Sequence, residues 1–264
     1  MLPLVLVGGL ALWERYRGAS GSQSHTGALP DVPGLQRSVL DALPGLFGKW
    51  EGAALPYMYT DSKGFVTTGT GNLIDPVDRA LQLRWRRPDG SVASEGEVRA
   101  AWQTVKEAWP SVQSVRSKTL TDLRLDQAAL DGLMGQTIKS FVGYLVKRYP
   151  KFSTWPADAQ MAILSISWAW GPGFSSRWGA LGKDFDQAVN ATPPKFTEAG
   201  SLMRKASAHE ESINPGIVPR DIATQAMLVK ADAGRAALPV LGKIAVAAGA
   251  GLAVLWGAPK VFGR

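Results

Sequence analysis

Residues 57–75 read YMYTDSKGFVTTGTGNLID, and this stretch decides the fold. Two runs rich in β-branched and aromatic residues flank the sequence DSKG at 61–64. This arrangement is typical of a β-hairpin, because the glycine supplies the positive φ that a tight turn needs. Gly69 and Gly71 interrupt the second run, where we expect a bend or a close backbone approach. The stretch therefore predicts a small element of short antiparallel strands.

Helical patterns surround this element on both sides. Apolar spacing predicts a short helix before it, and Ser94 with Glu97 forms a capping box that starts a helix ending near Ala108. The order of elements predicts an α+β domain that is mostly α-helical, with a small β-hairpin subdomain. The helix before the hairpin covers residues 44–53, and the other expected helices cover residues 123–149 (with interruptions at its glycines), 156–170, 183–190, 197–212 and 219–233.

The composition excludes several kinds of chemistry. The chain has 264 residues, no cysteine and two histidines, so it has no thiolate nucleophile, no cysteine-based metal site and no three-histidine zinc site. His25 lies in a Gly/Ser stretch and His209 lies beside two glutamates, which favours solvated side chains over catalytic bases. Carboxylates are therefore the best remaining acid–base groups, and no metal or cofactor is expected.

The charge balance is mildly basic. The net charge is +7, from 29 basic and 22 acidic residues, and +4 of it falls between residues 46 and 235. This excess suits a polyanionic surface such as a bacterial envelope. Nucleic-acid binding is not expected, because the chain has no Lys/Arg run of the kind that a nucleic-acid-binding arm shows.

Both ends of the chain are apolar, which suggests a division into four parts. Residues 1–17 begin with thirteen uncharged residues, a helix of ~20 Å that is shorter than the ~30 Å hydrocarbon core of a bilayer. Residues 18–42 are rich in Gly, Ser and Pro and are interpreted as a flexible linker before a body at 43–235. Residues 236–264 predict an apolar helix that either enters a membrane or is buried against partner subunits.

Three side chains around the hairpin suggest chemistry: Glu51, Asp61 and Thr67. Glycoside hydrolysis needs one carboxyl to protonate the leaving oxygen and a second carboxylate to activate water or to stabilise the sugar cation. Glu51 follows Trp50, and an apolar environment would raise its pKa and keep it protonated. The Thr67 hydroxyl could hold the water, since it both donates and accepts. Spacing alone is a weak argument, because many hairpins carry an aspartate in the turn.

The whole pattern is more specific than its spacing. It resembles the signature Glu…Tyr-x-Asp-x-x-Gly-x-x-Thr-x-Gly-x-Gly of tailed-phage lysozymes, the muramidases that cleave peptidoglycan. The likeness continues more faintly at 158–171, the family's central buried helix, and at 216–220, where its last helix opens, so it covers about residues 43–233. The matching residues of the signature are Glu51, Gly52, Tyr59, Asp61, Gly64, Thr67, Gly69 and Gly71.

Three features of the chain depart from the family pattern. The interval between Glu51 and Asp61 is one residue longer than in the best-known members. Asn72 stands where many members have His or Ser, and Asp221 replaces the second arginine of a common Arg-Arg pair. These departures affect the expected substrate contacts more than the acid.

The resemblance implies a lysozyme-like fold with two lobes, flanked here by apolar terminal helices, and assigns roles to individual residues. Glu51 would be the general acid, Asp61 the second carboxylate and Thr67 the hydroxyl that positions water. Arg220 would reach the catalytic glutamate, with a surface arginine near a helix start as an equal alternative. Trp168 and Trp170 are more simply explained as core than as sugar platforms. The substrate-binding residues would be Tyr59, Gly69 and Asn72.

The expected function is hydrolysis of the MurNAc–GlcNAc β-1,4 bond of peptidoglycan, with inversion if the two carboxyl groups are ~6.5–9.5 Å apart. The protein would belong to a phage particle or to the bacterial envelope, with its catalytic domain on the periplasmic side of the inner membrane, and would aid wall penetration during genome entry. Residues 1–13 and 236–262 would contact a membrane or other virion proteins, and a homo-oligomer is left open.

Three alternatives remain. The first is an endolysin retained by its membrane segment until release. The second is a lytic transglycosylase that uses the same Glu51 and forms a 1,6-anhydro product without attack by water. The third is a structural or pore-forming virion protein whose lysozyme-like domain only binds glycan or has lost activity.

Overall fold

The computed structural model describes residues 29–51, 54–61, 63–112, 114–213 and 217–234. They form a mostly helical α+β fold with one small antiparallel sheet, as the sequence predicts. Both apolar ends, on which the membrane and virion contacts were predicted, lie outside the described residues. Within the described part, no helix is both long enough and apolar enough to cross a membrane.

The sheet contains the predicted hairpin. Its three antiparallel strands follow the order β1 (Leu55–Thr60), β2 (Val66–Gly69) and β3 (Asn72–Leu73). Tyr59 of β1 pairs with Thr67 of β2, which in turn pairs with Leu73 of β3. The turn between β1 and β2 lies where DSKG predicts it, and Gly64 has a φ of +80°.

The helices make up the rest of the described fold. Four short 3-10 segments connect them, namely η2 (Val77–Gln82), η3 (Ser114–Thr119), η4 (Phe152–Thr154) and η5 (Phe174–Arg177). A final helix over residues 218–234 is called the last helix below. The remaining helices are α1 (Arg37–Glu51), α2 (Glu95–Glu107), α3 (Gln127–Arg148), α4 (Ala157–Trp170), α5 (Gly179–Asn190) and α6 (Phe196–Ile213).

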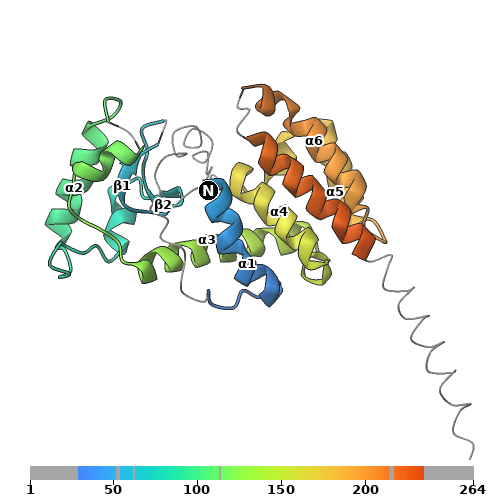
Figure 1. Ribbon diagram of the computed structural model, residues 1–264, viewed down its shortest axis with the longest axis horizontal. Coiled ribbons are helices and arrows are strands. Elements are labelled where there is room, and N and C mark those ends of the chain that lie inside the picture. The colour runs from blue at the N-terminus through green and yellow to red at the C-terminus, as the bar shows by residue number, and fades with distance from the viewer. Residues whose placement is uncertain (1–28, 52–53, 62, 113, 214–216, 235–264) are drawn as a thin grey trace, which may run out of the picture.

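The long helix α3 runs between the sheet and the other helices (Figure 1). It contributes side chains to two separate hydrophobic cores. Its first turns contribute Leu130 to a small core beneath the sheet and α2. Its later turns contribute Ile138 and Leu145 to a larger core shared with α1, α4, α5, α6 and the last helix. The sheet and α2 therefore lie at one end of α3 and most of the helices at the other, which gives two lobes.

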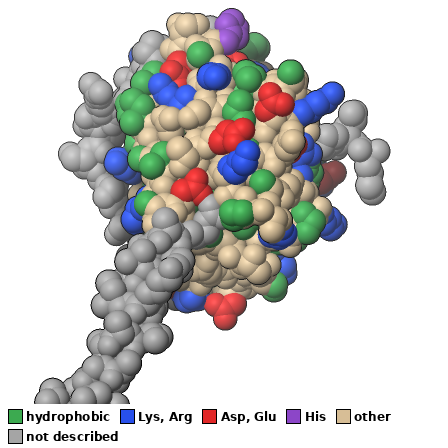
Figure 2. All heavy atoms as spheres, turned by 90° about the vertical axis from the view of Figure 1, so that its right-hand side faces the viewer, with side chains coloured by type: hydrophobic (Ala, Val, Ile, Leu, Met, Phe, Trp, Pro, Cys, Tyr) green, Lys and Arg blue, Asp and Glu red, His purple; other side chains and the backbone are tan. Residues whose placement is uncertain are grey.

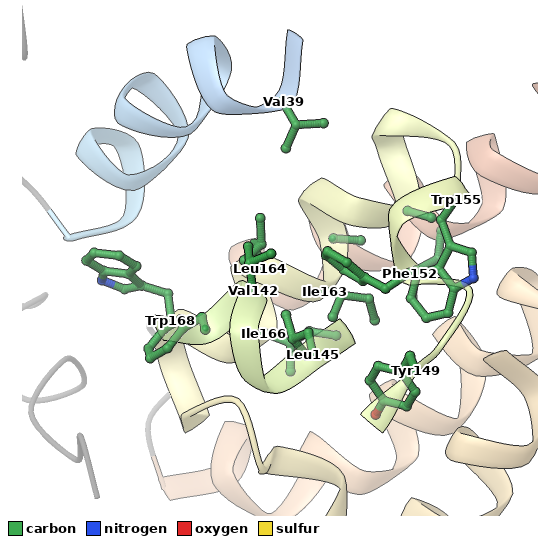
Figure 3. Close-up of a cluster of buried hydrophobic side chains, with 14 of the residues drawn as sticks. Val39, Val142, Leu145, Tyr149, Phe152, Trp155, Ile163, Leu164, Ile166 and Trp168 are labelled. Atoms are coloured by element: carbon green, nitrogen blue, oxygen red, sulfur yellow. The ribbon is translucent and has the colours of Figure 1, made fainter. Parts of the chain in front are cut away.

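The larger core is rich in aromatic side chains (Figure 3). Trp168 of α4 stacks on Phe47 of α1 with ring centroids 3.9 Å apart, and Trp155 packs between Tyr149 and Phe196. Burying one large apolar side chain contributes about 1.5–3 kcal/mol, so this cluster fixes α1 firmly against α4. The prediction that Trp168 belongs to the core is confirmed, since it is 8% exposed.

The start of α1 differs from the prediction. The helix begins at Arg37 rather than near Pro44, which lies inside it. Residues 37–42, assigned to the flexible linker 18–42, are therefore helical, and Leu29 and Val32 are buried in the larger core. The predicted linker is therefore too long at its C-terminal end. The buried side chains of Val39 and Leu40 give the first turns of α1 an apolar face, so these residues pack as a helix.

The glycines of α3 also behave differently from the prediction. The helix runs without interruption from Gln127 to Arg148, past Gly132, Gly135 and Gly143. A glycine inside a helix lowers the stability of the helix by about 1 kcal/mol relative to alanine. The packing of α3 against both cores offsets this loss. Gly135 faces Pro30, so the segment that precedes α1 packs against α3 at this glycine.

The ends of α2 and α4 agree with the sequence. Ser94 accepts a hydrogen bond from the Glu97 backbone, and the Glu97 side chain accepts one in return, so the predicted capping box is present. The helix α4 ends at Gly171, whose φ is +81°. On the face formed by α5, α6 and the last helix, basic and acidic side chains are intermixed (Figure 2).

Candidate functional site

Glu51 is the last residue of α1, and its side chain is 6% exposed. The preceding turn anchors it, because Phe47 and Trp50 are buried. The strand β1 begins four residues later, so Glu51 lies where the helical part of the chain passes into the sheet. A carboxyl group at this position is held by a rigid helix and has lost nearly all contact with solvent.

Arg220, in the first turn of the last helix, reaches Glu51. Its Nη1 donates to Glu51 Oε1 at 2.5 Å, and its side chain is 7% exposed. Its Nη2 donates to the Ser165 carbonyl at 2.8 Å, while Thr224 Oγ1 donates to Ser165 Oγ at 3.1 Å. Ser165 of α4, which Thr224 of the last helix contacts, therefore fixes the Arg220 guanidinium. The guanidinium in turn fixes one carboxyl oxygen of Glu51.

The environment of Glu51 favours the protonated acid. Burial is the largest influence and raises the pKa of Glu51, while the charge and the hydrogen bond of Arg220 lower it in part, so the pKa stays above its ordinary value. Because Arg220 contacts Oε1, the other oxygen is the atom that would carry a proton. This is the arrangement of a group that can deliver a proton in a fixed direction.

Asp61 has a structural task in the hairpin. Its Oδ1 accepts hydrogen bonds from the backbone nitrogens of Lys63 at 2.8 Å and Phe65 at 2.9 Å, and the residue is 7% exposed. The Asp61 nitrogen also donates to the Phe65 carbonyl at 2.9 Å. One carboxylate oxygen therefore closes the turn between β1 and β2, and this fixes the orientation of the side chain.

Thr67 and Tyr59 face each other across the sheet. The Thr67 hydroxyl donates to the Tyr59 carbonyl at 3.2 Å, which leaves its oxygen lone pairs to accept. Thr67 is 3% exposed and Tyr59 is 1% exposed. Tyr59, predicted to bind substrate, thus has no ring surface at which a sugar could stack, and its position is that of a core residue of the small lobe.

Gly69 and Asn72 shape the turn between β2 and β3. Gly69 has a φ of +61°, and a Cβ there would lie 2.7 Å from Asn72 Oδ1, so only glycine fits without displacement. Asn72 Nδ2 donates to Thr137 Oγ1 of α3 at 3.1 Å, which ties the sheet to the connecting helix. Of the two, Asn72 lies at the wall of a cavity.

This cavity, about 680 Å³ in volume, opens between the two lobes. One face of α3 forms its floor, with Asn72 and Leu73 on one side and residues 171–173, Ser176 and Arg177 on the other. Of the described residues that line it, Arg177 is the only charged one. Such a volume is in the range of small-molecule sites, although Glu51, Asp61 and Thr67 are not among its lining residues.

The structure therefore joins some of the predicted site residues and not others. Glu51 and Arg220 are in direct contact, although 169 positions separate them. Asp61, Thr67 and Tyr59 are joined to one another through the hairpin, and among the described residues Glu51 has no hydrogen bond to any of them.

Sequence reasoning missed the residues that support Arg220. Ser165 and Thr224 are 0% and 1% exposed. A serine within the apolar run ILSISWAW was the available signal, because a buried hydroxyl needs a partner. Their role became visible only when the fold placed the last helix against α4.

The fold and these contacts define a mostly helical α+β protein with a buried carboxyl group held by an arginine. No family model matches the chain, and neither the curated proteins nor the solved structures contain a significant match to it. The function is therefore argued from the site itself.

Proposed function

We propose that the chain is a peptidoglycan-degrading glycoside hydrolase, a muramidase that cleaves the MurNAc–GlcNAc β-1,4 bond. The observation that carries this proposal is the buried Glu51, whose pKa is raised and whose Oε1 is held by Arg220 at 2.5 Å. A glycosidase needs a carboxylic acid that keeps its proton near neutral pH and points it at the leaving oxygen. The sequence signature of the hairpin supplies the substrate class.

In this mechanism Glu51 protonates the glycosidic oxygen through its second carboxyl oxygen. The Asp61 carboxylate, oriented by two backbone N–H groups, stabilises the cation-like sugar or activates water. Thr67 accepts a hydrogen bond from that water, because its own proton is engaged with the Tyr59 carbonyl. The cavity along α3 would accommodate part of the glycan strand.

A lytic transglycosylase is the second candidate, and one observation favours it. The turn between β1 and β2 uses Asp61 Oδ1, so the fold alone accounts for this aspartate. A transglycosylase would need only the acid at Glu51 and no second carboxylate.

The decisive experiment is digestion of purified peptidoglycan by the wild type and by Glu51→Gln. Glu95→Gln, an exposed residue in the first turn of α2, is the matched control. We expect Glu51→Gln to lose more than about 100-fold of the activity, because an amide cannot deliver a proton, and the control to keep it. Equal activity in the Glu51 and Glu95 variants, or none in the wild type, would overturn the proposal. Mass analysis of the products separates the two chemistries, since hydrolysis leaves reducing ends and a transglycosylase leaves anhydro ends.

Placement in a phage particle or at the cell envelope, with the apolar ends at a membrane or at virion proteins, is part of the same proposal. Its support is the sequence of residues 1–13 and 236–262. Flotation with liposomes, comparing chains with and without residues 236–264, tests it separately, and equal flotation would remove the membrane contact.

A further inference from the structure

The cavity between the two lobes combines neutral hydrogen-bonding groups with a single kind of charge. Of the described residues that line it, none is acidic. A ligand that enters it therefore meets no carboxylate that would repel an anionic group. The neutral hydrogen-bonding side chains at its wall are those of Asn72, Gln136, Thr137, Ser140 and Ser176.

Tyr144 of α3 supplies an aromatic ring to this cavity and is 40% exposed. Its hydroxyl lies against Gly173, because a Cβ at Gly173 would be 3.3 Å from Tyr144 Oη. Gly171 and Gly173 have no side chains, so backbone forms the wall beside the ring. An aromatic ring next to neutral hydrogen-bonding groups suits a ligand that has both apolar faces and hydroxyl or amide groups, as an N-acetylated sugar has.

The guanidinium of Arg177 lies at the same wall. A Cβ built on Gly171 would be 3.8 Å from Arg177 Nη2, and Gly171 itself lines the cavity. Arg177 is exposed, and within the described part of the chain it forms no ion pair. Arg148, by contrast, is paired with Asp186 in the same lobe. The charge of Arg177 is therefore available to a ligand.

The segment that carries Arg177 is held in place by the larger core. Phe174, at the start of η5, is 0% exposed and packs against Phe185 of α5 with ring centroids 5.5 Å apart. Ser175 Oγ lies 3.4 Å from the Tyr149 hydroxyl. Because the backbone of η5 is fixed by these contacts, ligand binding needs to order only the side chain of Arg177.

We infer that Arg177 is a specificity-determining residue: it binds a carboxylate carried by the N-acetylated glycan strand that occupies this cavity. A guanidinium binds a carboxylate through two parallel N–H···O bonds, which a neutral sugar cannot offer. Peptidoglycan presents such groups on its peptide stems, and on the lactyl group of MurNAc where the stem is absent. The inference rests on the proposed function for the identity of the glycan.

This contact should affect substrate binding and not the chemical step. Glu51 is not among the residues that line the cavity, so Arg177 contacts a part of the strand away from the reacting bond. An interaction that is equally strong in the ground state and in the transition state changes KM and leaves kcat unchanged. We therefore expect Arg177→Gln to raise the KM for peptidoglycan fragments at an unchanged kcat.

Binding to the full-length Glu51→Gln variant tests the contact without cleavage. Three ligands of equal length are titrated by calorimetry: glycan oligomers with peptide stems, the same oligomers without stems, and a neutral chito-oligosaccharide. We expect Arg177→Gln to weaken the binding of an acidic oligomer by about 10-fold, less at high salt, and to leave the neutral ligand unaffected. Loss on the first ligand identifies the stem as the source of the carboxylate, and loss on the second identifies the lactyl group.

Two further variants complete the comparison. Arg177→Lys keeps the charge but not the paired donors, so it should lose less affinity than Arg177→Gln. Lys139→Gln is the matched control, because Lys139 is an exposed residue of α3 that does not line the cavity. It removes one positive charge and should bind all three ligands as before.

The outcomes separate this inference from the proposed function. Unchanged binding of both acidic oligomers by Arg177→Gln overturns the inference, and so does an equal loss on the neutral ligand, which would mean that the arginine only shapes the cavity. Cleavage by the wild type in either case leaves the muramidase proposal standing. Absence of cleavage by the wild type defeats that proposal instead, and the titrations still decide whether Arg177 binds a carboxylate.

Discussion

Replacing Arg220 by methionine should destabilise the fold strongly and in a pH-dependent way. Both members of the Glu51–Arg220 pair are nearly inaccessible, with side chains 6% and 7% exposed. At a pH where Glu51 is ionised, removing Arg220 leaves its charge uncompensated, which costs about 3–5 kcal/mol. Arg220→Met also removes the hydrogen bond from the guanidinium to the Ser165 carbonyl, which costs about 1 kcal/mol at any pH.

The pH dependence follows from the pKa of Glu51. Arg220 lowers this pKa in part, so its loss raises it further. A carboxyl whose folded pKa is raised contributes stability at low pH and loses it as the pH rises, by up to about 1.4 kcal/mol per pH unit. The cost of Arg220→Met should therefore be smallest where Glu51 keeps its proton and should grow as the pH rises past the raised pKa of Glu51.

Urea unfolding followed by circular dichroism at several pH values measures this cost. The matched control is Arg99→Met on α2, whose contact with Asp78 is long, at 3.7 Å, and exposed, so it should cost less than about 1 kcal/mol. The double variant Glu51→Gln with Arg220→Met removes the buried charge and should recover about 2 kcal/mol. A cost for Arg220→Met equal to that of Arg99→Met, or the same at every pH, would refute the assignment of a desolvated pair.

Four further substitutions, at Gly182, Gly132 and Asp61, test the packing and the hairpin. Gly182→Ala should destabilise by about 3 kcal/mol, because the new Cβ would lie 1.8 Å from the Ser175 carbonyl oxygen, whereas Gly132→Ala, with nothing within 4 Å, should be neutral or stabilising in thermal unfolding. Asp61→Asn should fold almost as well as the wild type, because the amide oxygen still accepts the two turn hydrogen bonds, while Asp61→Ala should lose about 1–2 kcal/mol. If hydrolysis needs the carboxylate, the asparagine variant loses peptidoglycan cleavage while it stays folded, and retained cleavage with anhydro products would show that the aspartate serves the turn alone.

Local chemistry explains which parts of the fold could be predicted. The hairpin, the capping box at Ser94 and the end of α4 at Gly171 each depend on a few neighbouring residues, and all three are present. The start of α1 and the continuity of α3 depend on contacts between distant segments. Gly135 of α3, for example, lies against Pro30, and no sequence window around Gly135 contains that contact.

The same division applies to the candidate site. The resemblance supplied Glu51 and Arg220 separately, with a surface position as an equal alternative for the arginine, and only the packing of the last helix against α4 joins them. In the sequence, Asp221 is notable only because it replaces the second arginine of the Arg-Arg pair that is common in tailed-phage lysozymes. Asp221 is only 4% exposed, and its burial follows from the packing of the last helix and not from spacing in the sequence.

The two halves of the candidate site differ in what the fold requires of them. In the hairpin, Asp61 closes the turn, Thr67 bonds to a neighbouring strand and Gly69 adopts a positive φ, so each matching residue has a structural reason to be there. The contact between Glu51 and Arg220 has no comparable structural reason. Burying two charges costs several kcal/mol, and apolar side chains of similar size would stabilise the contact between α1 and the last helix equally well. Glu51 is a buried carboxyl at the end of a helix, with one oxygen held by Arg220 and the other left for a proton. The proposed acid catalysis requires this arrangement, whereas the stability of the fold does not. The proposed role of Glu51 as an acid catalyst therefore depends on its contact with Arg220 rather than on the hairpin residues of the signature.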